Sequence, residues 1–369
     1  MTTSRATWLQ RFLLPGFAFK AVVIGGGYAT GRELAEFFLP AGPWGGLAGM
    51  LLAMLLWSGI AALTFAFARR AGAYNYRSFF EALLGRGWIA FELAYALFVI
   101  LILAVFGAAA GAIGSALFGW PAIIGTAALA ITIAGFAAFG NRAVERLFKY
   151  VSLLLYAVYA LFLLLALTSF GDRITSHFGA ATLGTGWAAG GLTYASYNIV
   201  GAVVILPMLR HLTSQRDAIV AGLIAGPLAM LPAILFYIAM AAFYPEIGAE
   251  ALPSDFLLRQ MQLPLFHLVF QVMIFAALVE SGTGAVHAIN ERVASVWQVR
   301  HGPMRAPMRA LIAGALLIGC MVVAQRFGLV ALIAHGYRAL AAVFLAVYVL
   351  PLLTIGAWRL ATRPSALPA

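Results

Sequence analysis

A run of glycines interrupts an apolar segment near the start of the sequence. Four glycines fall within the seven residues Gly25–Gly31, directly after the apolar stretch Phe17–Ile24. Each glycine inside a helix costs about 1 kcal/mol relative to alanine, so we expect Gly25–Gly31 to be non-helical. Thr30 and Glu33 then stand in the T-x-x-E spacing of a capping box, which predicts that a second helix begins there.

Composition places this interruption inside a membrane. The 369 residues are 64% hydrophobic and only 9% charged, whereas a soluble domain carries roughly 25% charged residues. An unpaired backbone group in hydrocarbon costs several kcal/mol, so an interrupted helix persists only where it lines a cavity or is buried in protein. The interruption therefore marks a candidate binding site. The alternative is a glycine-rich helix packed closely on a neighbour.

Ten apolar segments are long enough to cross a bilayer, which takes about 20 residues. They lie at roughly 13–39, 43–68, 87–118, 120–139, 143–168, 185–209, 217–243, 264–297, 305–324 and 329–357. We therefore predict an all-α integral membrane protein with ten transmembrane helices, which form a single membrane domain over residues 1–369.

Lysines and arginines gather on one side of these segments. That side receives Arg5, Arg11, Arg69, Arg70, Arg77, Arg86, Arg142, Arg146, Lys149, Arg210, Arg216, Arg292, Arg300, Arg305, Arg309, Arg359 and Arg363. The opposite loops hold Arg173, Arg259 and Arg326. The positive-inside rule then predicts a multi-pass membrane protein with both termini in the cytoplasm. The net charge of +11 follows from this sidedness, so we expect the lipid bilayer as partner, no nucleic acid and no soluble partner.

The sixth segment is interrupted like the first. Polar residues and a glycine occur in Tyr194–Gly201, and Pro207 follows. Since five spans is an odd number, the second half must enter the membrane from the opposite side. We therefore predict two inverted repeats of five segments, 13–168 and 185–357, each with a broken first helix. Such a pair of interrupted segments is typical of a secondary-transporter site.

Two motifs carry a resemblance to a known family. The pattern IGGGYATGRELAEFF in segment one and VESGTGAVHAINERV (Val279–Val293) in segment eight resemble the YkvI-type bacterial membrane proteins. That family is placed in the amino acid–polyamine–organocation superfamily. The resemblance implies a LeuT-type five-plus-five fold, with the substrate held between segments one, three, six and eight.

The two interruptions supply the candidate substrate-binding residues. They are Gly25, Gly26, Gly27, Tyr28, Thr30 and Gly31 in segment one, with Ser196, Tyr197 and Asn198 in segment six. Half-helices that meet at a break present dipole ends of opposite sign, which suit a zwitterion such as an amino acid. The side chain of Asn198 can both donate and accept hydrogen bonds. The alternative for the three polar residues of segment six is hydrogen bonding between helices.

Four charged residues within the spans form a candidate outer gate. A charge at the bilayer centre costs about 2.5–3.5 kcal/mol on insertion scales, so each needs an explanation. Arg32, Glu33 and Glu36 fall in the outer half of segment one, and Arg338 lies at a comparable depth in segment ten. We predict that Arg338 pairs with Glu33 or Glu36 when the outer side is closed. Alternatively, Arg338 binds only carbonyls or water.

Glu280, near the middle of segment eight, is the candidate ion-coupling residue, with Ser281 and Thr283 beside it. The resemblance implies that small hydroxyl residues in this segment hold sodium in sodium-coupled members of the superfamily. Glu280 could join such a site, since hard cations take oxygen ligands. It could instead cycle its own proton, because burial disfavours the charged form of a carboxyl. The structural alternative is a buried Glu280 that is neutral or paired with Arg32 or Lys20.

These observations favour a secondary active transporter of a small polar or zwitterionic solute, an amino acid or amine. Transport would be coupled to protons or sodium by alternating access. The alternative is a membrane sensor or receptor that keeps the ligand site without turnover. An enzyme is not predicted, because the six histidines lack metal-ligand spacing and E-S-G-T-G is not a nucleophile motif. Sodium is the one cofactor considered.

Overall fold

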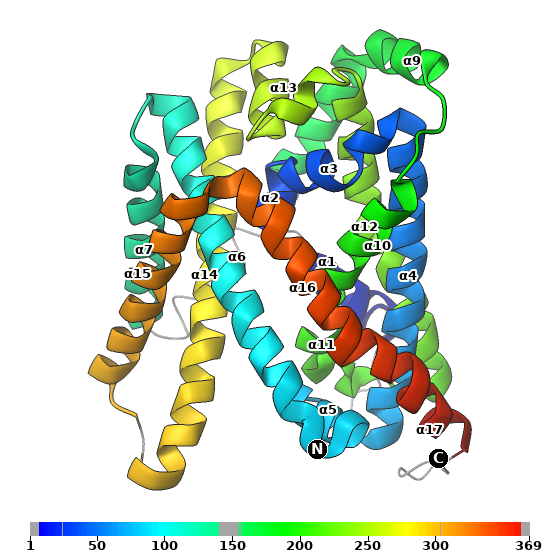
Figure 1. The fold of residues 1–369 in the computed structure, drawn as a ribbon, viewed down its shortest axis with the longest axis vertical. Coiled ribbons are helices and arrows are strands. Elements are labelled where there is room, and N and C mark those ends of the chain that lie inside the picture. Colours follow the sequence, from blue (N-terminus) through cyan, green and yellow to red (C-terminus); the bar gives the residue numbers. More distant parts are fainter. Residues whose placement is uncertain (1–6, 24, 140–154, 156, 303, 363–369) are drawn as a thin grey trace.

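The computed structural model describes residues 7–23, 25–139, 155, 157–302 and 304–362, and that part of the chain is almost entirely helical. The long helices form two groups (Figure 1). The first group contains α1 (Leu14–Val23), α4 (Gly42–Ala71), α10 (Trp187–Asn198), α11 (Val200–Val204) and α12 (Gln215–Ala241). The second contains α6 (Trp88–Phe118), α7 (Ala122–Phe139), α14 (Pro264–His301) and α15 (Ala306–Ala331).

Shorter helices cover the two ends of the molecule. Figure 1 shows α5 (Tyr76–Leu84) and α17 (Ala357–Thr362) at one end, and α9 (Gly171–Ala180) and α13 (Pro253–Met261) at the other. We call the α13 end the outer end and the α5 end the inner end, after the sidedness predicted from the charges. Between them α16 (Arg338–Phe344), flanked by π-helical turns, crosses the front of the bundle (Figure 1).

Residues at the starts of the short helices explain where these helices begin. Helix α5 is preceded by Asn75, whose side chain accepts a hydrogen bond from the Ser78 amide at 2.9 Å. An asparagine at this position satisfies one of the free N–H groups of the first turn. At the outer end α13 starts at Pro253, which is pre-organised for a first helical position.

Fewer than ten of the predicted membrane spans appear as long apolar helices in the described part of the chain. Within the described residues, five helices are long and apolar enough to cross a membrane, or up to six if the bent pair at 157–180 is one span. The first and sixth predicted segments are divided into short helices, and part of segment 143–168 lies outside the described residues. The ten-span count and the inverted repeat therefore stay predictions.

Close packing of α4 on α12 organises the first group. A Cβ atom on Gly222 would overlap the backbone of Ala62, and one on Gly226 would overlap Ser58. The two backbones approach so closely that the Ser58 hydroxyl donates to the Leu223 carbonyl at 2.9 Å. Small residues permit this contact between membrane helices, where packing and hydrogen bonds replace the hydrophobic effect.

The first segment is broken, although not over the whole expected stretch. Helix α1 ends at Val23, a single turn α2 (Gly26–Ala29) follows, and α3 (Arg32–Phe37) begins after Gly31 in the left-handed conformation at φ 80°. The prediction that all of Gly25–Gly31 is non-helical is wrong for that one turn. An isolated turn satisfies some backbone groups locally, as in the Ala29 amide that donates to the Gly25 carbonyl at 2.9 Å.

The predicted capping box at the start of α3 is incomplete. The residue before α3 is Gly31, which has no side chain to cap the helix. The Thr30 hydroxyl accepts from the Arg32 amide of the first turn at 3.4 Å and donates back to the Gly27 carbonyl at 3.0 Å, so the threonine half of the predicted pattern is present and the Glu33 half is not. The side chain of Glu33 is used elsewhere, as described below.

The break in the sixth segment is smaller than predicted. Helix α10 continues to Asn198, a single turn residue, Ile199, follows, and α11 resumes at Val200. The backbone at Ile199 remains near helical values, with φ −63° and ψ −17°. Polar side chains that bond to their own helix allow α10 to continue through the stretch that the sequence marked as interrupted.

Because Gly222 has no space for a side chain, we expect Gly222→Ala to destabilise the protein by about 1–3 kcal/mol through overpacking. Alanine is the better helix former, so propensity alone predicts the opposite sign. The matched control is Gly314→Ala in α15, where nothing lies within 4 Å of an added Cβ. Thermal unfolding of both purified variants checks the expectation, and equal melting temperatures would contradict it.

Candidate functional site

An inner cavity of about 380 Å³ lies between the two groups of helices. It is lined by Ala18, Ala21, Val22, Tyr95, Phe98, Val99, Ile102, Phe106, Val204, Ile205, Met208, Glu280, Ser281, Gly284, Ala285 and Ala288. These residues come from segments one, three, six and eight, as the resemblance implied. The walls are mostly apolar, and Glu280 is the one acidic lining residue.

The three predicted ion-coupling residues do not share one face of α14. Glu280 and Ser281 line the inner cavity, together with Gly284 and Ala288 on the same face. Thr283 is fully buried and does not line it, and its hydroxyl has no hydrogen-bond partner among the described residues. Glu280 and Thr283 are neighbours on the surface of α14, because they are three residues apart. The cavity, however, lies on the side of Glu280 that faces away from Thr283.

A second, outer cavity of about 220 Å³ lies on the α3 side of the break. Glu36 and Arg338 line it, and their side chains form an ion pair at 2.7 Å between Glu36 Oε1 and Arg338 Nη2. Glu36 also accepts from Arg32 at 3.1 Å. The predicted contact of Arg338 with an acidic residue of segment one is therefore present, and its role as a gate stays a prediction.

We call α13 and the connection before it, which contains Gly248 and Glu250, the outer cap. This outer cap covers the break in the first segment. Arg32 donates from Nη1 to the carbonyls of Gly248 and Glu250, at 2.8 and 2.9 Å, in the connection that leads to α13. The Ser254 amide of α13 donates to the Thr30 carbonyl at 2.9 Å. Backbone groups that the break leaves unpaired thus find partners in the cap, as a low-dielectric environment requires.

Glu33 connects the two broken segments. It is 3% exposed, and the Tyr197 hydroxyl of α10 donates to its Oε2 at 2.6 Å. Its other carboxyl oxygen lies against Gly27, where an added Cβ would overlap the carboxyl group. Gly27 therefore leaves room for the Glu33 side chain. The sequence pattern predicts this side chain in a helix cap and in an outer gate.

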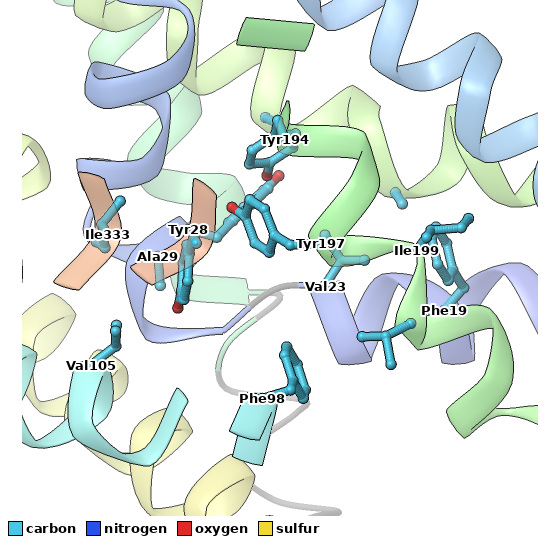
Figure 2. Close-up of a cluster of buried hydrophobic side chains, with 14 of the residues drawn as sticks. Phe19, Val23, Tyr28, Ala29, Phe98, Val105, Tyr194, Tyr197, Ile199 and Ile333 are labelled. Atoms are coloured by element: carbon cyan, nitrogen blue, oxygen red, sulfur yellow. The ribbon is translucent and has the colours of Figure 1, made fainter. Parts of the chain in front are cut away.

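Two of the polar residues predicted in segment six have structural partners within their own helix. Ser196 donates to the Leu192 carbonyl at 2.6 Å and Asn198 donates to the Tyr194 carbonyl at 3.2 Å, both within α10. Tyr28 is fully buried, and Figure 2 shows it near Ala29 with its ring directed away from the Tyr197 ring. Gly25 and the residues from Gly27 to Gly31 do not line the inner cavity, although Gly25 packs on Phe106, which does, and the surroundings of Gly26 lie outside what the structure describes.

Sequence reasoning missed the wall that α6 contributes. Tyr95, Phe98, Val99, Ile102 and Phe106 recur at helical spacing and face the inner cavity. The spacing is visible in the sequence, but α6 is apolar on every face, so periodicity cannot distinguish a lipid-facing stripe from a cavity-facing one. The aromatic content of this stripe was the one available signal.

Comparison with known sequences supports a distant homology. No protein-family model matches the chain. The chain is 23% identical over 289 residues to a protein of Bacillus subtilis (strain 168) named "Uncharacterized membrane protein YkvI", across 77% of this chain and 81% of that protein. The resemblance seen in the motifs is thus supported as a weak homology to a membrane protein, and membership of the superfamily stays a prediction.

Comparison with solved structures identifies the fold. A Na⁺-coupled sialic acid symporter in a substrate-bound outward-open state matches 95% of this chain and 81% of its own, with a TM-score of 0.61 at 14% identity. The manganese transporter of Eremococcus coleocola matches 96% and 81%, with a TM-score of 0.57 at 17% identity. MhsT in complex with L-phenylalanine matches 96% and 97%, with a TM-score of 0.55 at 15% identity. The chain is therefore similar in fold to LeuT-fold transporters.

If Gly27 makes room for Glu33, then Gly27→Ala destabilises the protein by about 1–3 kcal/mol. Removing the carboxyl makes space for the methyl group, so the double variant Gly27→Ala/Glu33→Ala loses less than the sum of the single changes, by about 0.5–3 kcal/mol. Gly59→Ala is the control, since an added Cβ there meets nothing within 4 Å. Additive melting shifts would show that Gly27 and Glu33 are not in contact.

Proposed function

We propose that this protein is a secondary active transporter that moves a small polar or zwitterionic solute, an amino acid or amine, across the bacterial inner membrane. The observation that carries the proposal is the one-sided access to the centre of the fold. The inner cavity includes exposed residues at Ala21, Val204 and Met208, and we propose that the cap and the Glu36–Arg338 pair close the outer side. Alternating access requires a conformation with this asymmetry.

The fold comparisons support transport as the general activity. Two of the similar structures are named as a symporter and a manganese transporter, and a third holds L-phenylalanine. Those cargoes differ in charge and size, so the fold alone does not select one. For this chain the solute class rests on the predicted dipole ends of the break and on a mostly apolar cavity with one acidic wall residue. A small amine or amino acid suits that combination.

Two proposals address the coupling ion. In the first, Glu280 at the wall of the inner cavity takes up and releases a proton during the cycle. In the second, a sodium ion binds near segment eight, where the buried Thr283 hydroxyl has no hydrogen-bond partner among the described residues. A buried hydroxyl without a partner is costly, and an ion would satisfy it. Glu280 and Ser281, the other oxygen donors predicted for that site, face the inner cavity, so this second proposal places the ion at Thr283 without them.

The membrane arrangement belongs to the same proposal. Ten spans in one domain, divided into inverted repeats over 13–168 and 185–357, would place both termini in the cytoplasm. Supporting this, α5 and α17 lie together at the inner end, opposite the cap formed with α13 (Figure 1). The non-transporting alternative, a sensor with the same ligand site, predicts saturable binding without counterflow.

Flux into proteoliposomes tests the function and its coupling. With candidate amino acids and amines screened first by thermal shift, we expect uptake driven by a pH gradient in the unaltered protein. Glu280→Gln should abolish this uptake while exchange at equal pH persists. Glu291→Gln, the same change at an exposed position of α14, is the control and should retain gradient-driven uptake. Uptake that requires sodium, ignores a pH gradient and survives Glu280→Gln would exclude the proton role and favour sodium.

The outer ion pair generates a second expectation. Arg338→Glu places two acidic side chains together, so closure of the outer side and transport should fall by about tenfold, equivalent to roughly 1.4 kcal/mol. Arg338→Glu/Glu36→Arg should restore part of the loss, and only part because Arg32 also contacts Glu36. The control Arg326→Glu makes the same charge change at an exposed position. Absence of any rescue would count against a gate.

A further inference from the structure

We propose that Glu33 is a proton-operated switch of the outer side, with Tyr197 as its positioning partner. The neutral acid holds the closed outer side, and the carboxylate favours the open one. This inference extends the proposed transport function but does not depend on the identity of the solute or on the role of Glu280. It rests on where Glu33 lies, what touches it and what separates it from water.

Glu33 lies in the closed layer between the two cavities. It lines neither of them, whereas Glu36, one turn later on α3, lines the outer cavity and Glu280 lines the inner one. Phe37 of the outer cavity packs on the ring of Tyr197, with ring centroids 5.8 Å apart, and Tyr197 in turn holds Glu33. Glu36 thus lies at the outer cavity, Glu280 at the inner cavity, and Glu33 in the closed layer between them.

The surroundings of Glu33 are polar but uncharged. Among the described residues no cation lies within ion-pair distance of Glu33, since Arg32 directs its guanidinium to Glu36 and to the cap. The Tyr197 hydroxyl donates to it, and the ring of Tyr194 packs on the ring of Tyr197, with ring centroids 5.7 Å apart. Figure 2 shows that the side chains of Tyr194 and Tyr197 lie together in this layer. A carboxyl with such neighbours and no counter-ion is more cheaply held as the neutral acid.

Opening of the outer side changes this environment directly. The cap bonds to Arg32 and Thr30, and the Glu36–Arg338 pair spans from α3 to α16; separation of these contacts admits water to α3. A hydrated carboxyl can lose its proton to that water and remain charged. The proton therefore travels between water at the outer side and a carboxyl oxygen of Glu33, and no other bond changes. Protonation and closure are linked in both directions.

Cysteine accessibility measures this linkage without requiring transport. The chain has a single cysteine, Cys320, which is buried, so Cys320→Ala gives a clean background. Thr193→Cys then reports on the outer cavity and Ala288→Cys on the inner one. Alkylation rates are recorded from acidic to alkaline pH and divided at each pH by the rate in the Glu33→Gln background. This ratio cancels the ionisation of the thiol itself.

The ratio for Thr193→Cys should rise from one at low pH to about fivefold at high pH, because glutamine mimics the neutral acid and keeps the outer side closed. The ratio for Ala288→Cys should fall over the same range. Ratios of one at every pH would overturn the proposal and leave Glu33 with a structural role. Pronounced pH dependence of accessibility together with failed solute flux would retain the switch and reject the transporter.

Matched variants separate Glu33 from its neighbours. Tyr197→Phe removes the hydroxyl that donates to Glu33 and should shift the midpoint of the pH profile, whereas Tyr194→Phe should not, since the Tyr194 hydroxyl has no hydrogen-bond partner among the described residues. His267, which contacts Asp255 in the cap at 2.6 Å, and His335, in the π-helical turn that packs on α3, are histidines of the elements around Glu33. His267→Gln and His335→Gln should each keep the profile. If Glu33→Gln fails to accumulate, the alkylation rate of Thr193→Cys with Tyr197→Phe is divided at each pH by the rate without Tyr197→Phe, and a quotient that is the same at every pH overturns the proposal.

Discussion

The need of every backbone polar group for a partner inside the membrane governs this structure. A helix can be interrupted at depth only if other parts of the protein supply the missing hydrogen bonds. Here the break in the first segment is served by its own single turn α2, by the Thr30 hydroxyl and by the Ser254 amide of the outer cap. The cap is therefore part of the structure of the break, and a movement of one requires a response from the other.

The sequence predicted the all-helical membrane architecture, the interruption of segment one and the contact between segments one and ten. Those features depend on local composition and on the cost of charge in hydrocarbon, both of which are visible in one chain. The T-x-x-E spacing of Thr30 and Glu33 was misleading, because a capping box competes with tertiary partners that a sequence does not show. Tyr197 lies 164 positions from Glu33 and offers the carboxyl a buried hydroxyl.

The interior of the candidate site was less predictable. Which flank of α14 meets the cavity decides whether Ser281 or Thr283 lines it, and helix rotation follows from packing among several apolar helices. The same limit hid the stripe of α6. The size of the break in segment six was overestimated, since Ser196 and Asn198 bond to their own helix and so stabilise it.

The glycine contacts between α4 and α12 have a mechanical consequence. Because the backbones of α4 and α12 touch at Gly222 and Gly226, the two helices cannot slide past each other without steric overlap. They therefore move as one rigid body. Any large movement of helices in this protein must then occur at the interface between the α4–α12 pair and the group of α6, α7, α14 and α15. The inner cavity lies at this interface. The interleaved glycines thus determine where the molecule is able to bend.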